Sequence, residues 1–385
     1  VKNKEGNFCK IANKKEVIMK RSFIREILES IDEETISFAG GLPNKALFPL
    51  QQLQKASNTI FNNPKVLQYS LSNGIKSLRQ KIAKQYNQEG FESTEDNILI
   101  TTGSQQAMYI IAKYFQSKAI TIEEPSYLGA MNIFRLNALK MSGVKLEEDG
   151  IDLNAFEESF KSTQLAYLIP DFQNPFSSTY SDEKREEVAK IVQKYDGILI
   201  EDAPYRELYF DKKHPTISAL IPHQSFHLGS FSKTLAPSLR IGWIRASKEL
   251  IQSLLIIKES IDLHSCGISQ YILDEYLNDE SQYTKHLETL RREYQAKMNF
   301  FTQTLEEILP EFKFTKPQGG MFIYGNLEGI DSFALVQKCI QNKVVYVPGS
   351  EFYIEKRVNG EIRFNYSHSN FEAITKGIGL IKNSL

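Results

Sequence analysis

Between residues 97 and 245 the chain alternates short, unbroken apolar runs with helical segments, and this alternation constrains the fold more than any other feature. Strands that are apolar on both faces and separated by helices are typical of a mostly parallel sheet covered by helices on both sides. The sequence therefore predicts a doubly wound α/β architecture, in which ligands bind at the carboxyl ends of the strands. The expected strands are Asn97–Thr101, Ala119–Ile122, Ala166–Ile169, Gly197–Ile200, Ser225–Leu228 and Ile241–Ile244.

Helical patterns lie on both sides of this region. Amphipathic spacing predicts helices over 50–62 and 75–89, and residues 247–305 form a long, largely helical stretch. A second domain follows from about residue 310, where strands and helices alternate again. Its expected strands are 320–324, 344–347 and 361–365, and its expected helices are 332–342 and 370–384.

Charge and composition exclude several functional classes. The 46 basic and 47 acidic residues nearly cancel, which argues against nucleic-acid or membrane-surface binding by the chain as a whole. Three widely separated cysteines form no disulfide framework, as expected of a protein in the reducing cytoplasm. The six histidines lack metal-ligand spacing, and no apolar run approaches the roughly 18 residues needed to cross a bilayer. We therefore expect no metal site and no membrane span.

The stretch Leu228–Arg240 follows the fifth expected strand and contains a single lysine, Lys233, between two serines and a threonine. A surface lysine in a polar turn is the ordinary interpretation, because lysine is mostly exposed. A lysine in this place can also be a nucleophile that forms a Schiff base with an aldehyde. Ser230, Ser232 and Arg240 supply hydroxyls and a guanidinium that would bind a phosphate beside it.

The first two expected strands end in groups that suit the same ligand. Thr101–Ala107 opens a helix with small residues and would expose backbone N–H groups to an anion, although Ser104 can equally be a simple N-cap. Tyr127 follows the second strand and can stack on a flat ring, although packing is the more common role of such a residue.

Two more strands end in polar groups. Asn174 precedes a proline, which favours an extended backbone, and its amide can donate to a phenolate oxygen, although an ordinary Asn-Pro turn would look the same. Asp202 ends a buried strand, where a carboxylate is costly unless it meets a cation such as a protonated ring nitrogen. Tyr205 can reach the same ring. Together these strand ends describe a site for pyridoxal 5′-phosphate, a flat, phosphorylated aldehyde with a ring nitrogen.

The sequence resembles the fold-type I, pyridoxal-phosphate-dependent aminotransferases of class I and II. It is most similar to the branch that contains α-aminoadipate and kynurenine aminotransferases and the aminotransferase-like domains of winged-helix regulators. The resemblance extends from about Ser22 to the C-terminus. The matching segments are Ser37–Pro43, Gln68–Ser70, Ile100–Gln106, Gln173–Pro175, Glu201–Tyr205 and Gly229–Lys233.

The resemblance implies a fold and a division into domains. The expected fold is α/β, with a large domain around a mostly parallel seven-stranded sheet and a smaller α+β C-terminal domain. The implied division is an N-terminal arm and short helix over 1–48, a large cofactor-binding domain over 49–285 and a small domain over 286–385 that packs with the arm.

The resemblance also implies roles for the cofactor-binding residues. Lys233 would form the Schiff base and move the proton between Cα and C4′, and Asp202 would keep the pyridine nitrogen protonated. Asn174 and Tyr205 would hold the ring oxygen, and Tyr127 would stack on the ring. The phosphate would be held by Ser104, Gln105, Ser230, Ser232, Arg240 and, from the neighbouring subunit of a homodimer with shared sites, Tyr69.

Four positions match substrate contacts of the family. Arg363 corresponds to the arginine that clamps the substrate α-carboxylate, a task that suits a bidentate guanidinium. Gly40 corresponds to a backbone contact near this clamp, and Asn174 lies near it as well. Arg25 stands where the aminoadipate-type enzymes place an arginine that binds a side-chain carboxylate.

The sequence departs from the family pattern at two places. Phe176–Thr179 replaces the usual Thr-Gly after the Asn-Pro pair, and Ser238 stands where glycine is common. Neither change removes a reactive group, although the first alters a loop beside the site.

The implied function is a cytoplasmic aminotransferase that moves an amino group from an L-amino acid to a 2-oxo acid, often 2-oxoglutarate, by a ping-pong mechanism. Two alternatives use the same site. A lyase or decarboxylase would break another bond, because cofactor residues do not fix the reaction. A ligand-sensing domain of a winged-helix regulator would need an upstream DNA-binding segment, and no basic winged-helix pattern precedes residue 20.

Overall fold

A large mixed sheet forms the centre of the protein in the computed structural model, which describes residues 32, 34–355 and 357–385. Its strand order is β2-β9-β8-β7-β6-β3-β4-β5. The strands β3, β4, β6, β7 and β8 are mutually parallel, while β9 is antiparallel to both of its neighbours. The bounds are β2 Ile98–Thr101, β3 Ala119–Glu124, β4 Lys140–Glu147, β5 Gly150–Ile151, β6 Leu165–Leu168, β7 Ile198–Asp202, β8 Ser225–Ser230 and β9 Gly242–Arg245.

This sheet confirms the predicted α/β class with one addition. The expected seven strands are present, and the two-residue strand β5 pairs with the end of β4 as an eighth. The six apolar runs that the sequence identifies all lie in strands of this sheet, because strands covered on both faces have no polar face to present.

Two helical layers cover the sheet, and strand residues alternate between them. Tyr167 and Ile200 belong to one core cluster, with the helices α4 and α5, whereas Leu168 and Leu199 belong to a second cluster, with α6, α7 and α8. Side chains on a strand point alternately to opposite faces, so the two clusters lie on opposite sides of the sheet. The bounds are α4 Ser104–Tyr114, α5 Leu128–Leu136, α6 Leu153–Thr163, α7 Asp182–Lys194 and α8 Ile217–Leu220.

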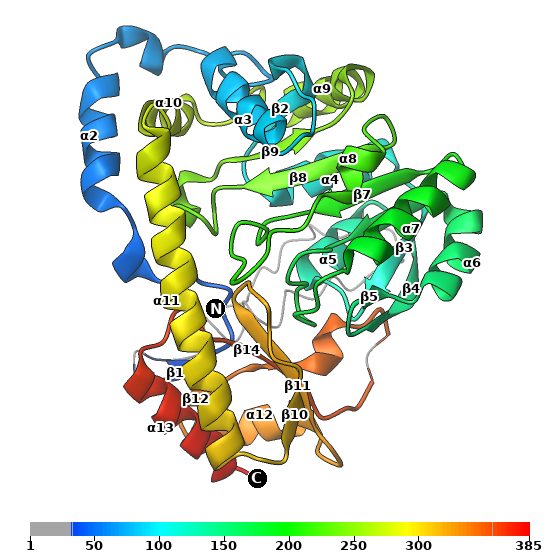
Figure 1. The fold of residues 1–385 in the computed structure, drawn as a ribbon, viewed down its shortest axis with the longest axis vertical. Coiled ribbons are helices and arrows are strands. Elements are labelled where there is room, and N and C mark those ends of the chain that lie inside the picture. The colour runs from blue at the N-terminus through cyan, green and yellow to red at the C-terminus, as the bar shows by residue number, and fades with distance from the viewer. Residues whose placement is uncertain (1–31, 33, 356) are drawn as a thin grey trace, which may run out of the picture.

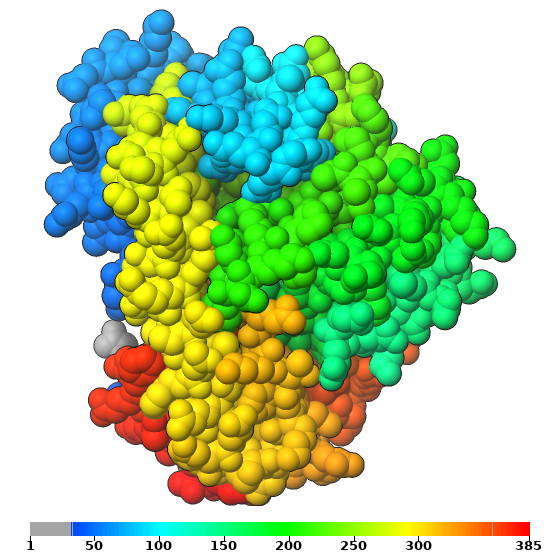
Figure 2. All heavy atoms as spheres, in the orientation of Figure 1, coloured from blue at the N-terminus to red at the C-terminus, as the bar shows by residue number. Residues whose placement is uncertain are grey.

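Three successive helices, rather than one helical stretch, follow the sheet: α9 Lys248–Asp262, α10 Gly267–Tyr276 and α11 Glu280–Ile308. The first break falls at Leu263, whose φ of 58° does not continue a helix. Side-chain caps from Ser247 and Asp279 begin α9 and α11. In the space-filling view α11, in yellow, extends along the molecule from the large sheet to the C-terminal part (Figure 2).

The helices α2 Leu50–Ile60 and α3 Lys76–Gln88 form with nearly their predicted bounds. Both pack against α10, and α3 also contacts the edge strand β2. Short 3-10 turns lie at Lys45–Leu47, Pro64–Leu67, Glu95–Asn97, Pro237–Leu239 and Gly349–Phe352.

The C-terminal part contains a separate four-stranded sheet with the order β10-β11-β14-β13 (Figure 1). The predicted strand at 344–347 divides in two, because Val344 and Val345 pair with the N-terminal strand β1 while Val347 pairs with β14. The N-terminal segment is thereby fixed to this part of the molecule. The bounds are β1 Ile36–Ser37, β10 Phe312–Phe314, β11 Phe322–Leu327, β12 Val344–Val345, β13 Val347–Pro348, β14 Glu361–Asn365, α12 Ser332–Gln341 and α13 Phe371–Lys382.

One buried cluster extends from the large sheet into the C-terminal sheet, and Phe38 joins the N-terminal segment to it. The ring of Phe38 contacts Phe301 of α11 and Phe364 of β14 edge-on. Because α11 is continuous through residue 286, the expected boundary between 285 and 286 stays a prediction. Within the described residues, no helix combines the length and apolar character that a bilayer span requires.

Candidate active site

Lys233 lies in the turn that follows β8, and its side chain reaches the N-terminal segment. Its Nζ donates a hydrogen bond of 2.6 Å to the carbonyl oxygen of Gly41. Desolvation lowers the pKa of Lys233 to about 8, and the positive charges of Arg363 and Arg240 add to the shift. A half-buried amine with this pKa is partly neutral near physiological pH and can act as a nucleophile or a base.

Asp202 ends β7 and is almost fully buried. Its Oδ2 accepts a 2.8 Å hydrogen bond from the hydroxyl of Tyr167, while its Oδ1 is buried and has no hydrogen-bond partner among the described residues. Burial raises the pKa of Asp202 to about 7, and the bond from Tyr167 acts in the opposite direction. A buried carboxylate oxygen without a partner is costly, so this atom marks the place of a missing donor.

Arg363, Asn174 and Tyr205 form a continuous hydrogen-bonded chain. Nη1 of Arg363 donates to Oδ1 of Asn174 at 2.7 Å, and Nδ2 of Asn174 donates to the Tyr205 hydroxyl at 3.1 Å. Nη2 of Arg363 donates to the carbonyl of Ala39 at 2.6 Å. Burial lowers the pKa of Arg363 to about 10, so it stays charged at neutral pH. This chain fixes the orientation of the guanidinium.

Gly40 lies between Ala39 and Gly41, whose backbone carbonyls accept hydrogen bonds from Arg363 and Lys233. The N-terminal segment thus connects the predicted base to the predicted carboxylate clamp. A Cβ on Gly41 would lie 3.3 Å from the ring of Phe322, so this approach leaves little room for a side chain.

The residues predicted to bind the phosphate lie around the N-terminus of α4, to which the side chain of Arg240 extends. Nη1 of Arg240 donates to the Ser232 hydroxyl at 3.4 Å, and the Ser230 hydroxyl accepts from the Ser232 backbone at 3.1 Å. Nη2 of Arg240 lies 3.3 Å from the carbonyl of Thr102. Ser104 is the first residue of α4, and Gln105 is exposed in the first turn of the same helix. A helix N-terminus beside a guanidinium suits a phosphate.

Gly103 makes this approach of Arg240 possible. It caps α4 with a φ of 76°, and a Cβ there would lie only 2.4 Å from Nη2 of Arg240. Only glycine adopts this backbone conformation without strain and leaves the guanidinium its place.

Tyr127 caps the start of α5 and is half-buried, close enough to Gly129 that a Cβ there would lie 2.6 Å from the tyrosine ring. Tyr69 lies apart from the other predicted residues. Its ring is 80% exposed and contacts the ring of His264 edge-on at 5.8 Å. Arg25 lies outside the described residues.

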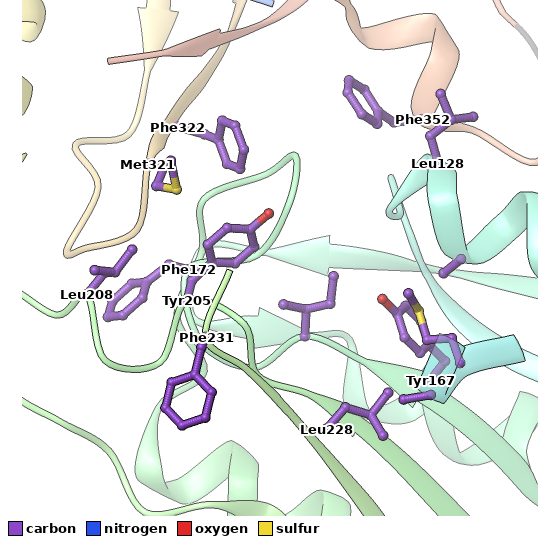
Figure 3. Packing of buried hydrophobic residues seen from close by; sticks show 14 of the residues in the cluster. Leu128, Tyr167, Phe172, Tyr205, Leu208, Leu228, Phe231, Met321, Phe322 and Phe352 are labelled. Carbon is purple, nitrogen blue, oxygen red and sulfur yellow. The ribbon is translucent and has the colours of Figure 1, made fainter. Parts of the chain in front are cut away.

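Aromatic side chains of the C-terminal part contact Tyr205 and Arg363. Phe322 of β11 contacts the ring of Tyr205 edge-on at 5.6 Å, and Figure 3 shows the two side chains next to each other. The guanidinium of Arg363 lies 4.3 Å from the centroid of the Phe322 ring and 5.1 Å from that of Phe352. These rings exclude water around the guanidinium, which strengthens its electrostatic interactions.

Sequence reasoning missed several of these groups. Tyr167, which orients Asp202, stands inside an apolar run and gives no polar signal. The carbonyls of Ala39 and Gly41 are backbone atoms, and the only hint of them was the glycine pair Gly40-Gly41. Phe322 lies within the expected strand 320–324, where an aromatic residue gives no signal of a site.

The residues present fit pyridoxal phosphate. The unpartnered Oδ1 of Asp202 suits a protonated ring nitrogen, the lowered pKa of Lys233 suits an amine that attacks an aldehyde, and Arg240 lies beside the N-terminus of α4 where a phosphate would bind. Among the residues that the structure describes, no cluster of histidine, cysteine or acidic side chains could hold a metal ion.

Comparison with known proteins gives consistent matches. The family model described as aminotransferase class I and II matches residues 35–378. The chain is 33% identical to aromatic-amino-acid aminotransferase 1 of Thermococcus litoralis over 97% of this chain and 93% of that protein. It is 34% identical to 2-aminoadipate transaminase of Thermus thermophilus over 93% and 92% of the two chains. The structure of Pyrococcus horikoshii kynurenine aminotransferase superposes with a TM-score of 0.92 at 32% identity, covering 98% of each chain.

Proposed function

The chain belongs to the class I and II aminotransferases and is a pyridoxal-phosphate-dependent transaminase, and from this premise we propose how its residues divide the reaction. Lys233 holds the cofactor and later serves as the base, Asp202 holds the ring nitrogen, and Arg363 holds the substrate carboxylate. The observation that carries this proposal is the N-terminal segment, which binds Lys233 through one carbonyl and Arg363 through another only two residues away.

When bound, pyridoxal phosphate supplies an electron sink that stabilises negative charge at the substrate Cα. The ionised Asp202 would keep the ring nitrogen protonated, which is the state in which the sink is effective. Asn174 and Tyr205 would hold the ring oxygen. The N-terminus of α4, with Ser104 and Gln105, and the group Ser230, Ser232 and Arg240 would hold the phosphate.

Lys233 would remove the proton from the substrate Cα. Its pKa of about 8 suits this task, because a general base works best when its pKa lies near the working pH. The first half-reaction would release a 2-oxo acid. The second would return the amino group to another 2-oxo acid, for which we propose 2-oxoglutarate.

Aromatic and dicarboxylic amino acids are the substrates that the site suits best. Phe322 and Phe352 lie against the guanidinium of Arg363 and would contact an apolar substrate side chain. Gly40 would contribute a backbone contact, and Arg25 would bind a side-chain carboxylate. The matched relatives are named for aromatic amino acids and 2-aminoadipate, which supports both classes.

We also propose a homodimer with shared sites. The segment 67–71 exposes Leu67, Tyr69 and Leu71 by 70%, 80% and 62%. Three large apolar side chains exposed in five residues are typical of an interface, and Tyr69 would reach the partner's phosphate site. Mixing Lys233→Ala with Tyr69→Phe subunits tests this, because hybrid dimers would contain one intact site and regain activity.

Two further expectations remain proposals. We assign the large domain to 49–285 and the small domain to 286–385, with the arm 1–48 packed against the latter. We place the protein in the cytoplasm, because Cys266 and Cys339 are free thiols, as expected in a reducing compartment.

A panel of amino donors with 2-oxoglutarate tests the proposed reaction. We expect steady formation of glutamate from several aromatic or dicarboxylic donors, followed together with the absorbance of the cofactor. Release of ammonia or carbon dioxide without glutamate would instead indicate a lyase or a decarboxylase.

A further inference from the structure

A second cavity lies on the face of the large sheet opposite to Asp202. Strand register establishes this position. Asp202 of β7 is paired with Leu228 of β8, whereas Glu201 is paired with His227. Paired residues of neighbouring strands share a face and successive residues alternate, so His227 points away from the side on which Asp202 lies.

The cavity has a volume of about 350 Å³, which is within the range of small-molecule sites. It lies behind the end of β8, between α3 and α11, which stand near each other beside the tip of this strand (Figure 1). Aromatic residues form much of its wall, and Trp243 lies so close over Gly229 that a Cβ on this glycine would be 2.1 Å from the indole. The aromatic residues that line it are Tyr86, Tyr209, Trp243 and Tyr283.

One buried donor of the cavity has no partner. His227 lines the cavity, is only 4% exposed, and its Nε2 makes no hydrogen bond among the described residues. Its Nδ1 lies 2.7 Å from the Tyr86 hydroxyl, which also accepts from the indole N–H of Trp243 at 2.8 Å. Since the indole can only donate, Nδ1 is the one acceptor beside the Tyr86 hydroxyl among its hydrogen-bond neighbours, and we assign the hydroxyl proton to it. The neutral ring therefore carries its proton on Nε2 and offers it as a donor.

The charged groups that line the cavity carry a small excess of positive charge, although each basic side chain also pairs with a carboxylate. Five basic side chains line it against three acidic ones. Burial lowers the pKa of His227 well below its usual range, and the nearby cations Arg206, Arg245 and Lys213 add to this shift. Arg206 is only 7% exposed; its Nη1 pairs with Glu89 at 2.5 Å and its Nη2 donates to the carbonyl of His214, whereas its Nε has no hydrogen-bond partner and lies 3.9 Å from Asp171. Two buried donors thus lack an acceptor at the same cavity.

We propose that this cavity is a second binding site, separate from the substrate site, for a small aromatic carboxylate. The carboxylate would accept from Nε2 of His227, and the ring would pack among the tyrosines and Trp243. The cavity is also bounded by Ser230, which is predicted to bind the phosphate, and by Ala203 and Pro204, which directly follow Asp202. A ligand there would touch the reverse side of the loop that carries the cofactor residues.

The only tryptophan of the chain, Trp243, lines this cavity and provides a local probe. The experiment is a titration of the holoenzyme with benzoate and with phenylacetate, followed by tryptophan fluorescence. Because both probes can also bind at the substrate clamp, the titration is repeated with Arg363→Ala. We expect a saturable change in fluorescence whose midpoint Arg363→Ala leaves unaltered.

Two variants test the cavity itself. His227→Asn keeps an acceptor for Tyr86 but loses the Nε2 donor, and Thr284→Phe fills the cavity from the exposed rim of α11. We expect each to weaken binding about tenfold or more. Thr289→Phe is the matched control, because Thr289 and Thr284 each donate to the carbonyl four residues earlier at 3.0 Å and Thr289 does not line the cavity.

Three results would overturn the proposal. The first is the absence of a saturable response to either probe in wild type, which would mean that the cavity holds only water. The second is loss of the response in Arg363→Ala, which would assign it to the substrate clamp. The third is equal binding by Thr284→Phe and Thr289→Phe, a comparison that stays informative even if His227→Asn does not fold.

Discussion

Nη1 of Arg363 lies 2.7 Å from Oδ1 of Asn174, and this bond joins the carboxylate clamp to the residue that would hold the cofactor ring. The two residues are 189 positions apart in the chain. Since Asn174 also donates to Tyr205, the position of the clamp is fixed relative to the ring site before any substrate binds. Such preorganisation is what aligns a substrate Cα with a base.

Replacing Arg363 by lysine should mainly impair substrate binding. Lysine keeps the charge but loses the bidentate geometry and the bond to Asn174. We expect kcat/KM to fall about 10- to 100-fold, largely through KM, since a hydrogen bond to a charged group contributes about 1.5–3 kcal/mol. Steady-state kinetics with an aromatic donor measures this. An unchanged KM would show that another residue binds the carboxylate.

Replacing Tyr167 by phenylalanine should weaken the site without removing a cofactor contact. The hydroxyl of Tyr167 donates a hydrogen bond to Oδ2 of Asp202, and its loss leaves this buried oxygen unsatisfied. We expect the free energy of unfolding of the apoenzyme to fall by about 1–3 kcal/mol. Denaturant titration measures this. No loss of stability would mean that Asp202 finds another donor.

The pKa of Lys233 predicts how the stability of the apoenzyme depends on pH. Its folded-state pKa of about 8 lies below its ordinary value of 10.5, so the unfolded chain binds more protons between these values. Stability attributable to Lys233 therefore rises as the pH increases from about 8 to 10.5. We expect this increment in wild type and its absence in Lys233→Met, as measured by denaturant unfolding at several pH values. Parallel profiles for the two proteins would contradict the lowered pKa.

Gly103 and Gly90 form a matched pair that separates backbone strain from loss of the phosphate site. Both have positive φ, 76° and 77°, but a Cβ on Gly103 would displace Arg240 whereas one on Gly90 meets nothing within 4 Å. We expect Gly90→Ala to cost about 1–2 kcal/mol of stability and Gly103→Ala, whose ψ of 169° lies in a region that only glycine adopts readily, to cost about 1–3 kcal/mol. Only Gly103→Ala should also weaken pyridoxal phosphate binding, measured by cofactor titration. Equal cofactor affinities would place the phosphate elsewhere.

The positions of Lys233 and Asp202 could be predicted from the sequence, because each follows an unbroken apolar run and the ends of such strands meet at one edge of a sheet. The partners of these residues could not. Tyr167 looks like packing within its strand, and the contact between Gly41 and Lys233 joins a backbone carbonyl to a side chain 192 residues away.

Two features of the fold also had no sequence signal. The break at Leu263 contains neither glycine nor proline, so the helical stretch from 247 to 305 appeared longer than any of its three helices. The cavity behind β8 depends on how α3 and α11 approach the sheet, which is a matter of tertiary packing. Sequence patterns report local periodicity and cannot report such distances.

The central claim is that Lys233 is the base and the attachment point of a transaminase, and the single-turnover rate of amino transfer in Lys233→Ala tests it most directly. The account predicts that the transfer from an aromatic or dicarboxylic donor to the bound cofactor slows by about 10²- to 10⁴-fold, because this is the usual contribution of a positioned general base. A rate equal to that of the wild type would contradict it.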